Sequence, residues 1–238
     1  MKKGFTLAEV LITLAIIGVV AALTIPTVIS KYQKNQYYTQ FMKAYNTLST
    51  AYQMSVAQNG DYQMWNLYDE SNPDYYKQFE KYIYSYLKID RICSEDNRSN
   101  CPSSYVIKHC PFNNCQDSPS DFLTDLVVGD FGVSPDLNIV FLQDGSAILS
   151  INYYDPNDGI AFIVDTNGIK APNTVGRDIF CFAAPHTYDG TTRFLPCGMY
   201  AAGEFVLEED IMLNCSDSDD GSASSCGARL LLEGKMDY

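Results

Sequence analysis

The sequence predicts an α+β fold in which a long N-terminal helix packs on an antiparallel β-sheet, with a helical insertion between them and disulfide-linked loops. Three features predict this fold. Apolar residues follow a helical pattern as far as residue 58, β-rich segments follow from residue 139, and eight cysteines lie between residues 93 and 226. Because 46% of the 238 residues are hydrophobic, the chain can bury a core, and global disorder is excluded.

The apolar segment over residues 10–29 is long enough to cross a bilayer, which takes about 20 apolar residues. Its only polar side chains are threonines, and a single carboxylate, Glu9, precedes it. A secretory signal peptide would have a shorter apolar core and a small-residue cleavage site, so it fits poorly. A plain membrane anchor explains the apolar run but not Glu9, because a charged group entering hydrocarbon is costly and marks a function by default.

The helix is expected to continue beyond this apolar segment. Residues 31–57 contain no Gly or Pro, and apolar side chains recur at three- and four-residue spacing at Tyr38, Phe41, Tyr45, Leu48 and Tyr52. We expect this stripe to pack on the chain's own sheet. The helix would cover residues 5–58 and end at Asn59-Gly60. Pro26 should bend it, because proline removes a backbone hydrogen bond.

A long insertion over residues 61–137 precedes the sheet. Asn72-Pro73 and the apolar spacing after it predict a second helix over 73–88, and a third, short helix is expected over 120–128. From residue 139 the pattern becomes that of strands, and Asp144-Gly145 between two β-rich runs is a strong hairpin signal. The expected strands cover 139–142, 147–151, 160–164 and 179–182.

The cysteines predict disulfides, because everything after the apolar segment would lie outside the cytoplasm, where disulfides persist. A zinc site would favour close cysteine pairs with histidines, but the sequence has no Cys-x-x-Cys, and only His109 stands beside a cysteine. Sequence proximity suggests the pairs Cys93 with Cys101, Cys110 with Cys115, Cys181 with Cys197, and Cys215 with Cys226.

The loop over residues 165–178 carries carboxylate and amide oxygens around a glycine turn, at Asp165, Asn167, Asn173 and Asp178. Oxygen ligands of this kind are the ones that calcium prefers. The loop begins like a calcium-binding loop but lacks the later bidentate glutamate of an EF-hand. The alternative is an Asx-rich turn whose side chains bond their own backbone.

The segment Gly4-Phe5-Thr6-Leu7-Ala8-Glu9-Val10-Leu11-Ile12 resembles the N-terminal signal of type IV pilins and of the pseudopilins of type II secretion. The resemblance is specific over residues 1–30 and implies a pilin-like fold. It implies that prepilin peptidase cuts between Gly4 and Phe5 and then methylates the Phe5 amine. It also implies that Glu9 of an incoming subunit meets the Phe5 amine of a subunit already in a filament. Calcium gains support too, since major pseudopilins bind it in a loop beside their sheet.

The same resemblance implies a domain organisation. Residues 1–4 would be a leader, 5–30 a transmembrane and filament-core helix, 31–58 its amphipathic continuation, and 59–238 a globular head. The chain would cross the inner membrane once, with Lys2 and Lys3 in the cytoplasm and the head in the periplasm, before entering an extracellular or periplasmic filament. The implied partners are prepilin peptidase and other pilin subunits, in a filament of one or several kinds of subunit.

Charge and motifs exclude several function classes. The net charge of −13 argues against nucleic-acid binding, which needs clustered Lys and Arg. No serine-hydrolase, zinc-protease or phosphate-loop motif is present, so we expect no enzymatic activity. We therefore expect a structural subunit, minor or specialised, of a type IV pilus-like filament. The alternatives are a pseudopilin that drives protein export and a membrane-tethered extracellular binding module that never polymerises.

Overall fold

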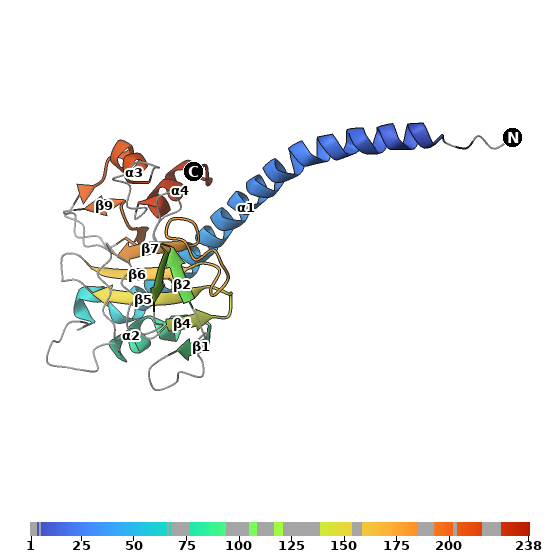
Figure 1. Cartoon of the computed structure of the whole chain (residues 1–238). Coiled ribbons are helices and arrows are strands. Elements are labelled where there is room, and N and C mark those ends of the chain that lie inside the picture. Colours follow the sequence, from blue (N-terminus) through green and yellow to red (C-terminus); the bar gives the residue numbers. More distant parts are fainter. Residues whose placement is uncertain are drawn as a thin grey trace.

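A computed structural model describes residues 4, 6–65, 67, 77–93, 105–108, 117–120, 139–153, 159–184, 193–201, 204–215 and 225–238. Figure 1 shows one long helix, α1, that projects from a head made of a sheet and several short helices. The α+β architecture predicted from the sequence is thus confirmed.

Helix α1 covers Leu7–Asn59, close to the predicted 5–58. Thr6 caps its start, and the backbone N–H of Gly60 closes its last turn on the carbonyl of Val56. Gly60 has a φ of 76°, a region that glycine enters without the penalty of a Cβ atom. The Asn59-Gly60 pair therefore ends the helix as expected.

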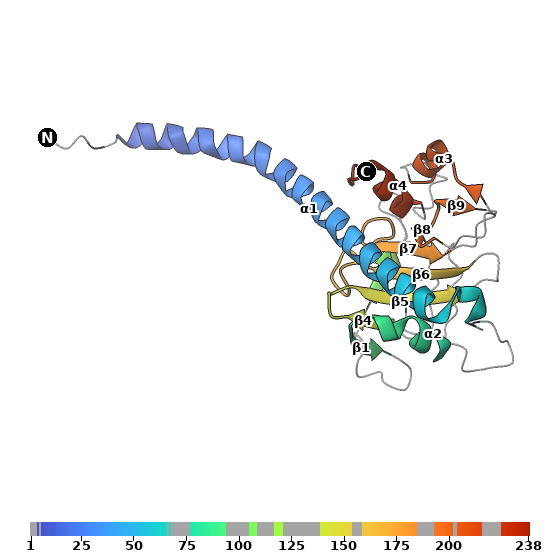
Figure 2. The same ribbon diagram turned by 180° about the vertical axis from the view of Figure 1, so that it is seen from behind.

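The N-terminal half of α1 contacts nothing in the head. Its large apolar side chains from Leu7 to Ile29 are exposed. The hydroxyls of Thr13 and Thr24 donate to the carbonyls of Val10 and Val20, so neither needs an outside partner. Pro26 lies inside the helix, and Figure 2 shows α1 curved along its length, in line with the expected bend.

Six strands form the main sheet, in the antiparallel order β1-β4-β5-β6-β7-β8. Their bounds are Ile89–Cys93 (β1), Ile139–Leu142 (β4), Ala147–Tyr153 (β5), Ile160–Asp165 (β6), Ile179–Ala184 (β7) and Leu195–Pro196 (β8). All four predicted strands are present. The turn at Asp144-Gly145 joins β4 to β5, and the backbone N–H of Leu142 bonds to the Ser146 carbonyl across it.

The amphipathic half of α1 packs on one face of this sheet, so the predicted stripe is confirmed. Phe41, Leu48 and Tyr52 are almost fully buried. The Phe41 ring lies 4.8 Å from the ring of Phe180 and 5.5 Å from that of Phe182, both on β7. Because buried aromatic side chains contribute strongly to the stability of a core, these contacts hold α1 on the sheet. The other face carries a second buried cluster that includes Ile139, Leu149, Ile163 and Cys215.

The insertion differs from its prediction. Helix α2 covers only Lys77–Tyr82, a 3-10 turn follows at Tyr84–Tyr86 (η2), and the chain then enters β1. The start of the predicted helix, 73–76, lies outside the described residues. Strand β1 was missed because it contains two charged residues, Asp90 and Arg91, and only the edge position makes such a strand possible. Trp65, which follows the short 3-10 helix η1 (Tyr62–Met64), stacks on Tyr82 with ring centroids 5.0 Å apart.

Part of the predicted third helix is also wrong. Ser120 is the last residue of β3 (Asp117–Ser120), which pairs with β2 (Tyr105–Lys108) in a separate two-stranded sheet. The remainder of that prediction, 121–128, lies outside the described residues. A second small sheet joins β9 (Tyr200–Ala201) to β10 (Glu204–Phe205).

Two disulfides fasten the C-terminal part of the head. Cys181 on β7 pairs with Cys197, just after β8, and Cys215 pairs with Cys226. The second disulfide joins the end of α3 (Glu208–Asn214) to the start of α4 (Cys226–Glu233). Both pairings are among those that sequence proximity suggests. Cys93 is also disulfide-bonded. Its predicted partner Cys101, and the predicted pair of Cys110 with Cys115, lie outside the described residues.

Truncation of Phe41 tests the contact between α1 and the sheet. Phe41→Ala should destabilise the head by about 3–5 kcal/mol, because it removes a fully buried ring and leaves a cavity. Tyr32→Ala, on the same helix but at a side chain that is 69% exposed, is the matched control and should change little. Urea unfolding of the detergent-solubilised chain, followed by fluorescence of Trp65, measures both. Equal midpoints for the two variants would contradict the packing described.

Candidate functional site

The N-terminal end of α1 places the residues of the predicted cleavage and assembly site. Gly4 is exposed and lies outside the helix, and a Cβ atom built on it would meet no atom within 4 Å. Phe5, the residue expected to be methylated, lies outside the described residues. The backbone just before α1 is therefore accessible at Gly4, where the predicted cut would fall.

Glu9 folds back onto the start of its own helix. Its Oε2 atom accepts hydrogen bonds from the backbone N–H and from the hydroxyl of Thr6, both at 2.8 Å. In return, the Thr6 hydroxyl accepts from the Glu9 backbone N–H at 3.3 Å. This reciprocal arrangement is a capping box, which satisfies backbone donors that a helix start leaves unpaired. The carboxylate is thereby held at the backbone N–H of Thr6.

The position of Glu9 has a chemical consequence. A helix N-terminus carries a partial positive charge, and this charge stabilises the ionised carboxylate of Glu9. If residues 1–4 were removed as the sequence predicts, the chain would begin at Phe5, directly before Thr6, to which Glu9 is hydrogen-bonded. The capping role of Thr6 escaped the sequence interpretation, although the pattern Thr6-x-x-Glu9 is itself a signal for a helix start.

The apolar half of α1 is the second part of this site. Among the described residues, α1 is the one helix long and apolar enough to cross a membrane, judged by length and composition. Its exposed side chains include Leu11, Ile17 and Leu23. At roughly 25 cal/mol per Å² of apolar surface, leaving this whole segment in water would be strongly unfavourable. The segment therefore requires an apolar environment that the head does not supply.

The loop between β6 and β7 brings together the four oxygen-bearing residues predicted as a possible calcium site. Asp178 is its centre: its carboxylate accepts from the backbone N–H groups of Asn173 and Thr174 and from the side-chain amide of Asn167. Asp165 Oδ1 accepts from the Asn167 backbone N–H at 2.9 Å, which is an Asx turn. The alternative of an Asx-rich turn thus describes the hydrogen bonds present.

Burial gives this loop an unusual electrostatic character. Asp165 and Asp178 are fully buried. Desolvation raises the pKa of the Asp178 carboxyl, and the donors from Thr174, Asn173 and Asn167 oppose that rise because they stabilise the charged form. Within the described residues, the side-chain oxygens of Asn167 and Asn173 are buried without a hydrogen-bond partner. These two amide oxygens lie in the same loop as the two carboxylates, so together they could coordinate a cation.

The donor set also limits which cations fit. Among the described residues, no group of three or more His, Cys, Asp or Glu side chains is placed to hold a metal ion. Two carboxylates with two amide oxygens suit a hard cation such as calcium better than zinc, which selects cysteine and histidine.

Comparisons with known proteins match two parts of the chain. Residues 1–25 match the model of the prokaryotic N-terminal methylation motif. Residues 27–118 match the model of a family of unknown function (DUF6613), which covers the rest of α1 and much of the insertion but none of the sheet from β4 onward. No curated protein and no solved structure matches the chain.

Proposed function

We propose that this chain, which carries in residues 1–25 the signature of type IV pilins and pseudopilins, is a structural subunit of a type IV pilus-like filament. The observation that carries the proposal is the combination of that motif with an apolar helix half that has no partner in its own head. The motif and the apolar helix fit anchoring in the inner membrane. The head would then lie in the periplasm until the subunit enters the filament.

Processing is the first step of the proposed function. Prepilin peptidase would cut after Gly4 and methylate the new Phe5 amine. The lysines at positions 2 and 3 favour a cytoplasmic leader, because positive residues stay on that side of the membrane. The accessible backbone at Gly4 supports this step.

Assembly is the second step. In the filament, the apolar half of α1 would exchange lipid for the same segment of neighbouring subunits. Glu9 would exchange its hydrogen bonds with Thr6 for the Phe5 amine of a neighbour, a pairing that the low dielectric of the filament core strengthens. The role is structural, and no residue of the head is assigned to catalysis.

Replacement of Glu9 by glutamine tests this assembly step. Glu9→Gln keeps an oxygen that can accept from Thr6, so the helix start and the processing should survive. Charge-assisted hydrogen bonds are worth about 1.5–3 kcal/mol, so incorporation into sheared filaments should fall by about tenfold or more. Immunoblots of sheared and membrane fractions measure the split. Normal incorporation of this variant would contradict the assembly step.

Two alternatives can be separated from the filament subunit by experiment. A pseudopilin of a type II secretion system would be processed, and deletion of its gene would block protein export. A membrane-tethered binding module that never polymerises would be absent from sheared filaments, while remaining in the membrane fraction.

We also propose that the loop over residues 165–178 binds calcium. The support is the pair of buried, unpartnered oxygens of Asn167 and Asn173 beside the carboxylates of Asp165 and Asp178. These four residues would hold the ion, which would stabilise the connection between β6 and β7. Its function would be structural, as a brace for the head rather than a reactive centre.

Calcium should accordingly raise the melting temperature of the full chain in detergent, whereas magnesium, which requires a smaller octahedral site, should raise it less. Asn173→Gly is the informative variant, because it removes one oxygen at a residue whose φ is +51°, a conformation that glycine tolerates. The calcium-dependent shift should shrink in this variant without a loss of calcium-free stability. If calcium leaves the melting temperature of the wild-type chain unchanged, the proposal is wrong.

A further inference from the structure

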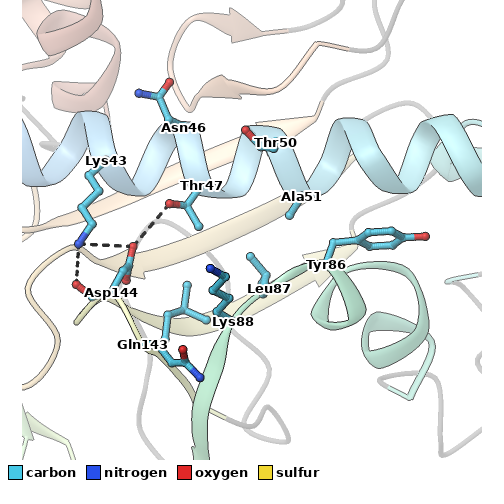
Figure 3. A pocket seen from close by; sticks show the side chains of 11 residues that line it. Lys43, Asn46, Thr47, Thr50, Ala51, Tyr86, Leu87, Lys88, Gln143 and Asp144 are labelled. Carbon is cyan, nitrogen blue, oxygen red and sulfur yellow. Dashed lines mark hydrogen bonds and ion pairs between the residues drawn. The ribbon is translucent and has the colours of Figure 1, made fainter.

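A hollow lies beside α1 at the β1–β4 end of the sheet. It has a volume of about 650 Å³ and is formed by one side of α1, by the segment from η2 to β1, and by the β4–β5 turn. Figure 3 shows these three walls and the side chains that they contribute. Leu87 is partly exposed and gives it apolar surface, whereas Ala51 and Leu142 line it but are almost fully buried. Lys43 and Lys88 bring positive charge to it.

Asp144, the acidic residue that lines this hollow, is bonded to neighbouring residues of its own chain. Asp144 accepts from the backbone N–H and the hydroxyl of Ser146, and from the hydroxyl of Thr47. Lys43 donates to the Asp144 backbone carbonyl at 2.7 Å and lies 3.9 Å from its carboxylate (Figure 3). Within the described part of the chain, Lys88 is exposed and has no ion-pair partner. Lys88 thus brings unneutralised positive charge to the hollow, on a protein whose net charge is −13.

A surface of opposite charge lies on α3. Leu207, Glu208, Glu209 and Met212 line one side of this helix, and Leu207 is 63% exposed. None of the carboxylates in the first turn of α3 has an ion-pair partner among the residues that the structure describes. We call these four residues the α3 edge. It combines two carboxylates with two apolar side chains, which is the complement of what the hollow offers.

The two surfaces lie at opposite ends of the sheet. The hollow adjoins β4 and the start of β1, whereas α3 packs on α4, which contacts β7 and β8. In Figure 1, α3 lies beyond β7 at the far end of the head from β1. One chain therefore cannot bring its α3 edge into its own hollow. Complementary surfaces on opposite sides of one molecule produce head-to-tail contacts, which generate open helical assemblies when the rotation does not close.

We propose that the hollow between α1 and the β4–β5 turn receives the α3 edge of a second copy of this chain. Glu208 and Glu209 would face Lys43 and Lys88 across the interface. Leu207 and Met212 would cover the exposed part of Leu87. The inference rests on the proposed function and adds to it a contact between heads, separate from the packing of the apolar helices.

Zero-length cross-linking with a carbodiimide tests this contact directly, because it joins a lysine to a carboxylate only when the two are in contact. The full-length protein would be cross-linked in sheared filaments and analysed by mass spectrometry. A dimer band containing a peptide from Lys43 or Lys88 joined to one from Glu208 or Glu209 is expected. Its yield should fall as salt is raised, because surface charges are screened.

Charge reversal supplies the control. Lys88→Glu, or Glu208→Lys with Glu209→Lys, should each reduce recovery of the chain in sheared filaments by about tenfold, because like charges would then face each other. Co-expression of the two reversed chains should restore a dimer cross-link between them. Lys81→Glu, at an exposed lysine of α2 that does not line the hollow, makes the same charge change and should have no effect.

The outcomes separate the inference from the proposed function. If wild-type protein is processed and present in sheared filaments but lacks this cross-link, the head contact is wrong and the filament role stands. A cross-link to a different pilin instead of a second copy would also overturn the inference, as would reversed variants that assemble normally. If wild-type protein is absent from filaments, both proposals fail.

Discussion

The exposed apolar half of α1 is the constraint on which the rest of the molecule depends. From Leu7 to Ile29 its large side chains touch nothing in the head, so the folded chain alone cannot bury them. An apolar environment outside the head, such as a bilayer or the proposed filament core, must do so, because apolar surface of this extent is unstable in water. The core of the head uses only the later half of α1, from Phe41 to Ser55, so it does not depend on what surrounds the apolar half.

Charged side chains in the described part of this molecule fall into two groups, those with hydrogen-bond partners in the chain and those without. The Glu9 carboxylate accepts hydrogen bonds from Thr6 in the single chain, and the proposed assembly step would exchange this local partner for the amine of a neighbour. In the head, Asp144 and Asp178 likewise accept hydrogen bonds from backbone N–H groups of their own turns, which lie at the same end of the sheet. Lys88 and the carboxylates of α3 have no such partner among the described residues. That contrast separates charges that stabilise the fold from charges available for contact with another molecule.

The sequence predicted the parts of the fold that have strong periodicity. The long helix, the stripe around Phe41 and the Asp144-Gly145 hairpin all follow from spacing that one segment carries by itself. Strand β1 and the short α2 did not, because a charged edge strand and a six-residue helix depend on tertiary contacts such as Trp65 on Tyr82. At the site, the motif around Gly4 and Glu9 was readable, whereas the unpaired oxygens of Asn167 and Asn173 emerge only from the folded loop.

The removal of the leader is the event that would commit this chain to a filament. Intact-mass spectrometry of the protein isolated from its native membrane tests it most directly. We expect a mass that lacks residues 1–4 and carries one added methyl group on Phe5. A chain that retains its leader, or one cut after the apolar segment instead, would contradict the filament role and leave a tethered or secreted protein in its place.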